Sequence, residues 1–262
     1  MKYVLPFLLI VAIYSEINFP GTTKPFREIE VAVPEAGIIY KINAKEGDLV
    51  RRGQIIAYLD ATLLRSSLKI AMARFKSKGN INAAQTTLKL ARKKLQKILQ
   101  LQQQNHIRAE EVEKAQAEVD LATARLLSAK EAQRIHYYEV QRIKTQIERH
   151  IVRAPATGII REFLKEKGES ISPAQPLCTL VQLDPIKIIA YPSFEETQQL
   201  KVKQQVQVTT SYNKKTYSGR VSFIDPVTDA ASNTVKVIIT IDNKNQSLKT
   251  GVICTINTQS KP

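Results

Sequence analysis

The sequence is poor in glycine, and its glycines are widely spaced. Nine glycines occur among 262 residues, and the closest two, Gly47 and Gly53, lie six positions apart. A Walker P-loop needs glycines five positions apart, a dinucleotide-binding fingerprint needs them two apart, and a nucleophile elbow needs them four apart. The spacing therefore excludes these three motifs, and with them the familiar nucleotide-hydrolysing loops.

Residues that bind metals or form disulfides are equally scarce. Cys178 and Cys254 each lie in an apolar, strand-like segment, which is typical of small core residues, and a disulfide between them is the alternative. The three histidines share no ligand spacing with each other or with a cysteine, and two methionines are too few for a copper cluster. We predict no catalytic, cofactor-binding or metal-binding residue, and we do not expect an enzyme.

An apolar run without charge, residues 3–15, follows Lys2. Its length of about a dozen residues suits a secretory signal peptide, whereas a membrane-spanning helix needs about 20. Because Ile13 and Ser15 make a poor cleavage site, a retained anchor is an alternative, and a buried N-terminal strand is another. We expect residues 1–20 to form a signal peptide or a short N-terminal membrane anchor, and the chain to be exported.

Two segments align without a gap when the sequence is shifted by 121 positions. Pro34-x-x-Gly37-Ile38-Ile39 falls on Pro155-x-x-Gly158-Ile159-Ile160, and Gly47-Asp48 falls on Gly168-Glu169. Each copy has the pattern of short strands separated by turns, with glycine where a turn needs positive φ. Since neither copy could bury a core alone, we expect residues 28–60 and 151–183 to pack together as one β domain.

The segment between the copies, residues 61–150, has one glycine and no proline and is rich in helix-forming residues. Apolar residues alternate by three and four from Val112 to Ile147, with Gln133 and His136 as polar interruptions, which predicts a coiled-coil seam. The same spacing in the first half slips by one residue near Gly79-Asn80, where we expect a kink. With a turn at residues 102–106, the segment predicts an antiparallel hairpin that projects from the β domain.

The charge of the hairpin is uneven. Residues 61–107 hold ten basic residues and no acidic one, whereas residues 108–150 hold eight of each sign. A solvated or partly paired helix surface explains this pattern, and contact with anionic lipid head groups is an alternative. Nucleic-acid binding is disfavoured because the chain has few aromatic residues and no recognition motif.

Residues 184–262 return to a strand pattern. We expect strands over residues 186–191, 206–210, 217–224, 235–241 and 252–256, turns at Asp225-Pro226 and Asp242-Asn243, and a short helix capped by Ser193. About five strands in fewer than 80 residues predict a small β-barrel domain.

The order of these parts resembles the periplasmic adaptor, or membrane fusion, proteins (HlyD-like) of bacterial tripartite pumps. Their lipoyl-like half-motifs are similar to Gly37-Ile38-Ile39 through Gly53-Gln54 and to Ala154-Pro155-x-x-Gly158 through Gly168-Glu169, with Gly37, Gly47, Gly53, Gly158 and Gly168 as turn positions. Their barrel pattern is similar to Gly219-Arg220-Val221 and Ile224-Asp225-Pro226. The resemblance implies a split lipoyl-like β domain with an inserted coiled-coil hairpin, followed by a β-barrel.

The resemblance also implies a function and a docking site. The chain would be a non-catalytic adaptor in the periplasm of a Gram-negative cell, associated with the inner membrane and supporting export. Its partners would be an inner-membrane pump (resistance-nodulation-division, with ABC and major-facilitator pumps as alternatives), an outer-membrane exit duct and further copies in a homo-oligomer, expected to be a hexamer. The duct-docking motif of such adaptors falls on the hairpin tip, at Lys97, Ile98, Leu101, Arg108, Val112 and Ala115, with Arg108 in place of the usual serine.

Two other functions fit parts of the sequence. A lipoyl or biotin carrier subunit would need a lysine on the turn after Asp60, yet the first lysine after that residue is Lys69. A basic coiled-coil protein that binds anionic surfaces would fit the charge but would leave the internal repeat unexplained.

Overall fold

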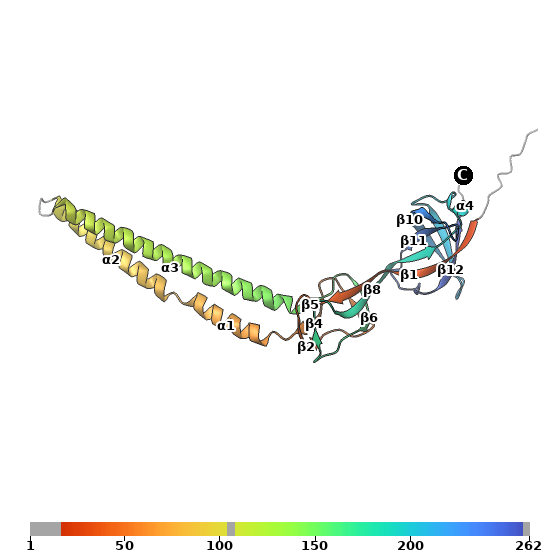
Figure 1. The fold of residues 1–262 in the computed structure, drawn as a ribbon, viewed down its shortest axis with the longest axis horizontal. Coiled ribbons are helices and arrows are strands. Elements are labelled where there is room, and N and C mark those ends of the chain that lie inside the picture. The colour runs from red at the N-terminus through yellow and green to blue at the C-terminus, as the bar shows by residue number, and fades with distance from the viewer. Residues whose placement is uncertain (1–16, 104–107, 259–262) are drawn as a thin grey trace, which may run out of the picture.

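The computed structural model describes residues 17–103 and 108–258. The molecule is elongated, with a helical hairpin at one end, a small β domain in the middle and a β-barrel at the other end (Figure 1). The expected fold class, β domains with an inserted antiparallel hairpin, is confirmed. The two β domains have separate buried clusters, and the hairpin has two more along its length, so the molecule has several small cores.

The two halves of the middle β domain exchange strands. The first half contains β2 (Gly37–Ile42), β3 (Leu49–Val50) and β4 (Ile55–Leu59); the second contains β6 (Gly158–Phe163), β7 (Ser170–Ile171) and the start of β8 (Pro176–Ala190). β2 pairs with β7, and β3 pairs with β6. Gly47 N–H donates to the Ile160 carbonyl and Gly168 N–H donates to the Ile39 carbonyl, each at 2.8 Å. The residues of the two bonds are related by the repeat shift of 121 positions. Each half therefore supplies strand partners to the other half.

The repeat extends to the strand that precedes each half. β1 (Ile17–Ala32) ends with Ala32 opposite Pro176 of β8, and β5 (Ile151–Arg153) ends with Arg153 opposite Ile55 of β4. Both pairs are related by the same shift of 121 positions. The structural repeat therefore begins before the prolines at which the sequence alignment starts.

Three of the five predicted turn glycines occupy turns. Gly47, Gly53 and Gly168 have φ of +87°, +84° and +95°, in the left-handed region that favours glycine. Gly37 and Gly158 instead begin β2 and β6, so their prediction as turn positions is wrong. Close packing is the constraint at Gly158, where an added Cβ would lie 2.6 Å from the Val181 carbonyl oxygen.

The hairpin consists of α1 (Thr62–Lys76), α2 (Gly79–Gln102) and α3 (Ala109–Arg149). The first arm is interrupted between Lys76 and Gly79, which confirms the predicted kink. The predicted seam of α3 is also confirmed, because its buried residues are Ala115, Val119, Ala122, Val140 and Ile143. The predicted turn begins at the end of α2, but residues 104–107 lie outside the described part of the chain.

The polar interruption of the seam lies opposite the break in the first arm. The Gln133 side-chain amide donates a hydrogen bond to the Phe75 carbonyl, near the C-terminal end of α1. The last carbonyls of a helix lack partners within the helix, so this bond satisfies a group that the break would leave free. The Tyr137 ring packs against the Phe75 ring at the same level, with 5.7 Å between the ring centroids.

The barrel is closed by six strands. In order around the barrel they are β1, β12 (Ile253–Thr258), β9 (Gln205–Thr210), β10 (Thr216–Asp229), β11 (Thr234–Ile241) and β8, which pairs again with β1. β1 and β8 run together from the barrel into the middle domain (Figure 1). The two β domains therefore share two continuous strands.

The first barrel strand comes from a segment that the sequence analysis assigned to a leader or anchor. Ile17 and Phe19 are buried in the barrel core, and residues 17–22 pair with β12. The assignment of residues 1–20 is therefore wrong for residues 17–20, whereas residues 1–16 lie outside the described part. The alternation of buried and exposed residues from Ile17 onwards is typical of a strand with one buried face.

In the barrel domain, the predicted short helix after Ser193 is confirmed, whereas one predicted turn is wrong. α4 (Phe194–Thr197) begins after Ser193, whose side chain accepts from Glu196 N–H while the Glu196 carboxylate accepts from Ser193 N–H. The predicted turn at Asp225-Pro226 is wrong, because both residues lie within β10, where its register against β11 is irregular. Proline has no backbone N–H to donate to a neighbouring strand. It is tolerated here because the irregular register leaves that position without a regular inter-strand hydrogen bond.

Both cysteines are buried and free, so the core interpretation is confirmed and the disulfide alternative is wrong. Burial raises the pKa of the Cys178 thiol and of the Cys254 thiol to about 11. Burial disfavours the charged thiolate, which is the reactive form, so neither thiol is positioned as a nucleophile.

Candidate functional site: the hairpin and its tip

The described residues hold no cluster that is typical of a metal centre. Within residues 17–103 and 108–258, no three His, Cys, Asp or Glu side chains lie close enough together to hold a metal ion. In the same ranges, no helix combines the length and the apolar character needed to cross a membrane.

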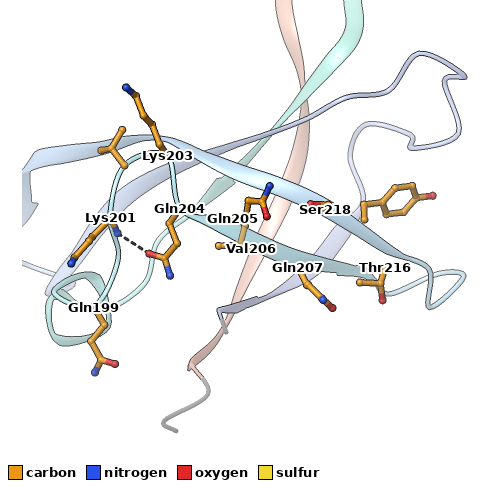
Figure 2. A pocket seen from close by; sticks show the side chains of 11 residues that line it. Gln199, Lys201, Lys203, Gln204, Gln205, Val206, Gln207, Thr216 and Ser218 are labelled. Atoms are coloured by element: carbon orange, nitrogen blue, oxygen red, sulfur yellow. Dashed lines mark hydrogen bonds between the residues drawn. The ribbon is translucent and has the colours of Figure 1, made fainter. Parts of the chain in front are cut away.

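A groove of about 940 Å³ opens on the barrel surface beside β9 and the start of β10 (Figure 2). Amide and ammonium side chains dominate its lining, including Gln199, Lys201, Lys203, Gln204, Gln205 and Gln207. Lys201 N–H donates to the Gln204 side-chain carbonyl at 2.9 Å, which stabilises the turn before β9 (Figure 2). No carboxylate, thiol or imidazole lines the groove.

The hairpin tip is the point most remote from the β domains (Figure 1). α3 begins after Arg108, which has an extended backbone (φ −74°, ψ 150°) and makes no capping hydrogen bond through its side chain. Glu110 and Glu111 lie in the first turn of α3, where negative charge complements the helix dipole. Lys114 contacts Glu110 at 2.8 Å, and this hydrogen bond raises the pKa of Lys114. The Arg108 side chain is exposed at the start of α3.

The predicted tip residues differ in exposure. Lys97, Leu101 and Arg108 are exposed, whereas Ile98 and Val112 are half-buried. Ala115 is only 1% exposed and lies in the seam between the arms, so its prediction as a partner-binding residue is wrong. The small side chain of Ala115 contributes to arm packing instead. Among the six predicted tip residues, Lys97, Leu101 and Arg108 are therefore the ones whose side chains are exposed to solvent.

The sequence analysis missed a second apolar surface on the hairpin. Four large side chains of α3 are 55–67% exposed, although the seam of this helix lies elsewhere: Leu121, Leu127, Ile135 and Tyr138. When the seam residues Val119 and Ala122 are taken as heptad positions a and d, these four occupy positions b, c and f, which are usually polar. The sequence could have predicted this surface, because it has apolar residues at heptad positions that face away from the seam.

Known proteins resemble this chain both over its C-terminal part and over nearly its full length. Residues 189–262 match the family described as CusB-like, beta-barrel domain. Multidrug resistance protein MdtE of Escherichia coli strain K12 is 27% identical over 260 residues, which cover 94% of this chain and 64% of MdtE. Nodulation protein NolF of Rhizobium meliloti strain 1021 is 26% identical over 240 residues, which cover 91% of this chain and 62% of NolF. The chain thus spans less than two thirds of the length of these curated relatives.

Solved structures share the fold over nearly the whole chain. MacA from Actinobacillus actinomycetemcomitans superposes with a TM-score of 0.80 at 21% identity, covering 94% of this chain and 79% of MacA. Membrane fusion protein Spr0693 from Streptococcus pneumoniae R6 superposes with a TM-score of 0.64 at 18% identity, covering 94% of this chain and all of Spr0693. The resemblance that the sequence motifs predicted is therefore confirmed.

Proposed function

We propose that this chain, which is similar in sequence and fold to membrane fusion proteins, is a non-catalytic adaptor that links an inner-membrane pump to an outer-membrane exit duct. In this function the two β domains associate with the pump, and the hairpin reaches toward the duct. Energy for transport comes from the pump, since the glycine spacing of this chain excludes the familiar nucleotide-binding loops.

One observation carries this proposal: a hairpin inserted into the middle β domain projects as a long arm away from both β domains (Figure 1). α3 alone has 41 residues, which at 1.5 Å per residue span about 60 Å. A rigid arm of this length suits a spacer between two membrane-bound partners. The carrier-subunit alternative is not supported, because α1 begins at Thr62, where a carrier would need a short lysine-bearing turn.

We further propose a resistance-nodulation-division transporter as the pump, with ABC and major-facilitator pumps as alternatives. The match of residues 189–262 to the CusB-like barrel supports the first of these. Several copies, with six as the expected number, would surround the pump. The relatives that this chain matches include proteins named for multidrug resistance and for cation efflux, so their names do not point to one cargo.

The proposed location is the periplasm of a Gram-negative cell, next to the inner membrane. The apolar run behind Lys2 supports export. A fusion of residues 1–30 to a reporter that is active only in the periplasm should be active in cells. An inactive fusion would contradict the proposed location.

The proposed docking residue is Arg108, with Leu101 and Val112 beside it. Replacing Arg108 with Glu reverses an exposed charge at the tip and leaves the apolar seam intact. In cells that depend on this chain for export, the variant should abolish export, because a charge that matched the duct now opposes it. Helix content and thermal unfolding of the purified variant should stay close to those of the wild type.

Lys144→Glu is the matched control, because Lys144 is an exposed α3 residue far from the tip. It makes the same change of charge and should leave export intact. Normal export by the Arg108→Glu variant would show that Arg108 is not a docking residue. Loss of export in the control as well would show that charge on the hairpin, rather than the tip, is what matters.

A further inference from the structure

The barrel domain exposes four large apolar side chains around the first half of β11: Tyr191, Phe194, Phe223 and Val227. They are 41–71% exposed and come from the residue after β8, from α4 and from β10. We call these four residues the apolar end of the barrel. Apolar side chains scattered singly on a surface need no explanation, but a set gathered on one surface is typical of a site that binds a protein or a membrane.

Tyr191 and Phe194 lie on either side of the contact between α4 and β11. Ser193, between them, forms an isolated β-bridge with Thr234, the first residue of β11. Phe194 N–H donates to the Asn233 carbonyl at 3.0 Å. Figure 1 shows α4 and the start of β1 at the end of the barrel that is turned away from the hairpin. Both side chains therefore lie at the end of the molecule most remote from the hairpin tip.

β10 brings Phe223 and Val227 to the same end. Phe223 pairs with Ile238 of β11, and Thr228, which follows Val227, pairs with Val235. Both side chains therefore lie beside the first half of β11. The irregular register of β10 in this region leaves Val227 as the most exposed member of the set, at 71%.

The sequence that precedes β1 favours lipid as the partner. Gly21, near the start of β1, pairs with Ala190, the residue before Tyr191, so β1 begins beside the apolar end. The uncharged apolar run of residues 3–15 is separated from Ile17 by a single residue. A bilayer that receives this run, as a leader in transit or as an anchor, therefore lies within a few residues of the apolar end.

Charged side chains near the apolar end are of both signs. Glu195 on α4 and Asp229 on β10 are exposed, and so are Lys201 and Lys203 on the turn before β9. Such a mixed surface has no strong preference for an anionic or a cationic partner. Apolar contact, rather than charge, is therefore the attraction that this end offers, and it is screened little by salt.

We propose that the apolar end of the barrel binds the phospholipid surface of the inner membrane, with its four apolar side chains inserted among the head groups. Apolar side chains gain free energy on leaving water, and a tyrosine ring suits the boundary between head groups and acyl chains. The hairpin lies at the opposite end of the molecule, so this contact leaves its tip remote from the bilayer (Figure 1). The inference rests on the proposed function only for the identity of the membrane.

Binding of the purified full chain to phospholipid vesicles tests the contact. Vesicles of phosphatidylethanolamine and phosphatidylglycerol should bind the wild type, and a change from low to physiological salt should have little effect. A Tyr191→Ser, Val227→Ser variant removes two side chains of the apolar end and should bind at least about 10-fold more weakly.

The matched control is a Tyr212→Ser, Ile253→Ser variant. It removes one tyrosine and one branched aliphatic side chain, 51% and 63% exposed, near the other end of the barrel, where β12 begins. The control should bind vesicles like the wild type. Circular dichroism and thermal unfolding should be alike for both variants, since all four substituted side chains are exposed.

A single introduced tryptophan shows whether the apolar end itself touches lipid. The chain has no tryptophan, so Phe194→Trp gives an emission signal that reports on this end alone. When the chain binds vesicles, the emission should shift to shorter wavelength, and lipids with brominated acyl chains should quench it. Tyr212→Trp should show neither change. This measurement separates the apolar end from residues 3–15, whose apolar run would hold the chain on vesicles without it.

The proposal is overturned by a wild-type chain that does not bind vesicles, or by a Tyr191→Ser, Val227→Ser variant that binds like the wild type. Unchanged emission of Phe194→Trp on vesicle-bound chains would also overturn it. Loss of export in cells by the Tyr191→Ser, Val227→Ser variant, together with unchanged vesicle binding, would show that the apolar end contacts a protein instead. Vesicles hold neither pump nor duct, so lipid binding can succeed even where the adaptor function fails.

Discussion

Two glycines of this chain differ in their tolerance of a side chain. An added Cβ at Gly158 would lie 2.6 Å from the Val181 carbonyl oxygen, whereas one at Gly79 would meet nothing within 4 Å. Gly158→Ala should lower the free energy of unfolding by about 1–3 kcal/mol, because backbone must shift to admit the methyl group. Gly79→Ala, at the start of α2, should be neutral or slightly stabilising. Urea unfolding of both variants checks the pair, and equal effects would contradict this account.

The buried thiols make stability depend on pH in the alkaline range. The folded-state pKa of Cys178 and of Cys254 is about 11, against an ordinary value of 9.0. The folded state holds these protons more tightly than the unfolded state, so the contribution is complete below pH 9 and is lost as pH rises toward 11. Urea unfolding of the wild type should weaken more steeply over this range than that of a Cys178→Ala, Cys254→Ala variant. Parallel pH profiles would contradict the prediction.

At the scale of elements, the break between α1 and α2 depends on a residue from the opposite helix. The Gln133 amide binds the Phe75 carbonyl near the end of α1. Gln133→Leu should cost about 1–2 kcal/mol, since it leaves a partly buried carbonyl without a partner. Hydrogen exchange should quicken in the last turn of α1 and stay unchanged around Leu88. Gln96→Leu, at an exposed site of α2, is the control, and equal exchange in both variants would refute the role of Gln133.

At the scale of the whole molecule, the N-terminal strand completes the barrel and continues into the middle domain. Phe19 is 2% exposed in the barrel core, whereas Phe194 on the same domain is 43% exposed. Phe19→Ala should lower the free energy of unfolding by about 3–5 kcal/mol, while Phe194→Ala should have little effect. Thermal unfolding of both variants provides the measurement. If Phe19→Ala were as stable as Phe194→Ala, β1 would not be part of the barrel in solution.

The same strand limits N-terminal processing. Because residues 17–22 pair with β12, cleavage within these residues would remove part of the barrel. We therefore expect the mature chain in cells to retain Ile17, whether or not the preceding residues are removed. Mass spectrometry of the purified chain would determine its first residue, and a mature start beyond Ile17 would contradict this expectation.

The sequence by itself determined the elements whose signals are local or periodic. The helical hairpin followed from the three-and-four spacing, the kink from a slip in that spacing, and the repeat from the shift of 121 positions. The cap at Ser193 followed from the acidic residues after it. These features depend on neighbours in the sequence or on regular repetition, so one chain is enough to predict them.

Tertiary structure alone decided which distant segments meet. β1 closes the barrel by pairing with β12 and β8, and the uncharged run before Ile17 hid this strand from the sequence analysis. Gly158 looked like a turn residue until the approach of the Val181 carbonyl was known. The physical reason is the same in each case: packing between residues far apart in sequence sets burial, and local propensity carries no information about it.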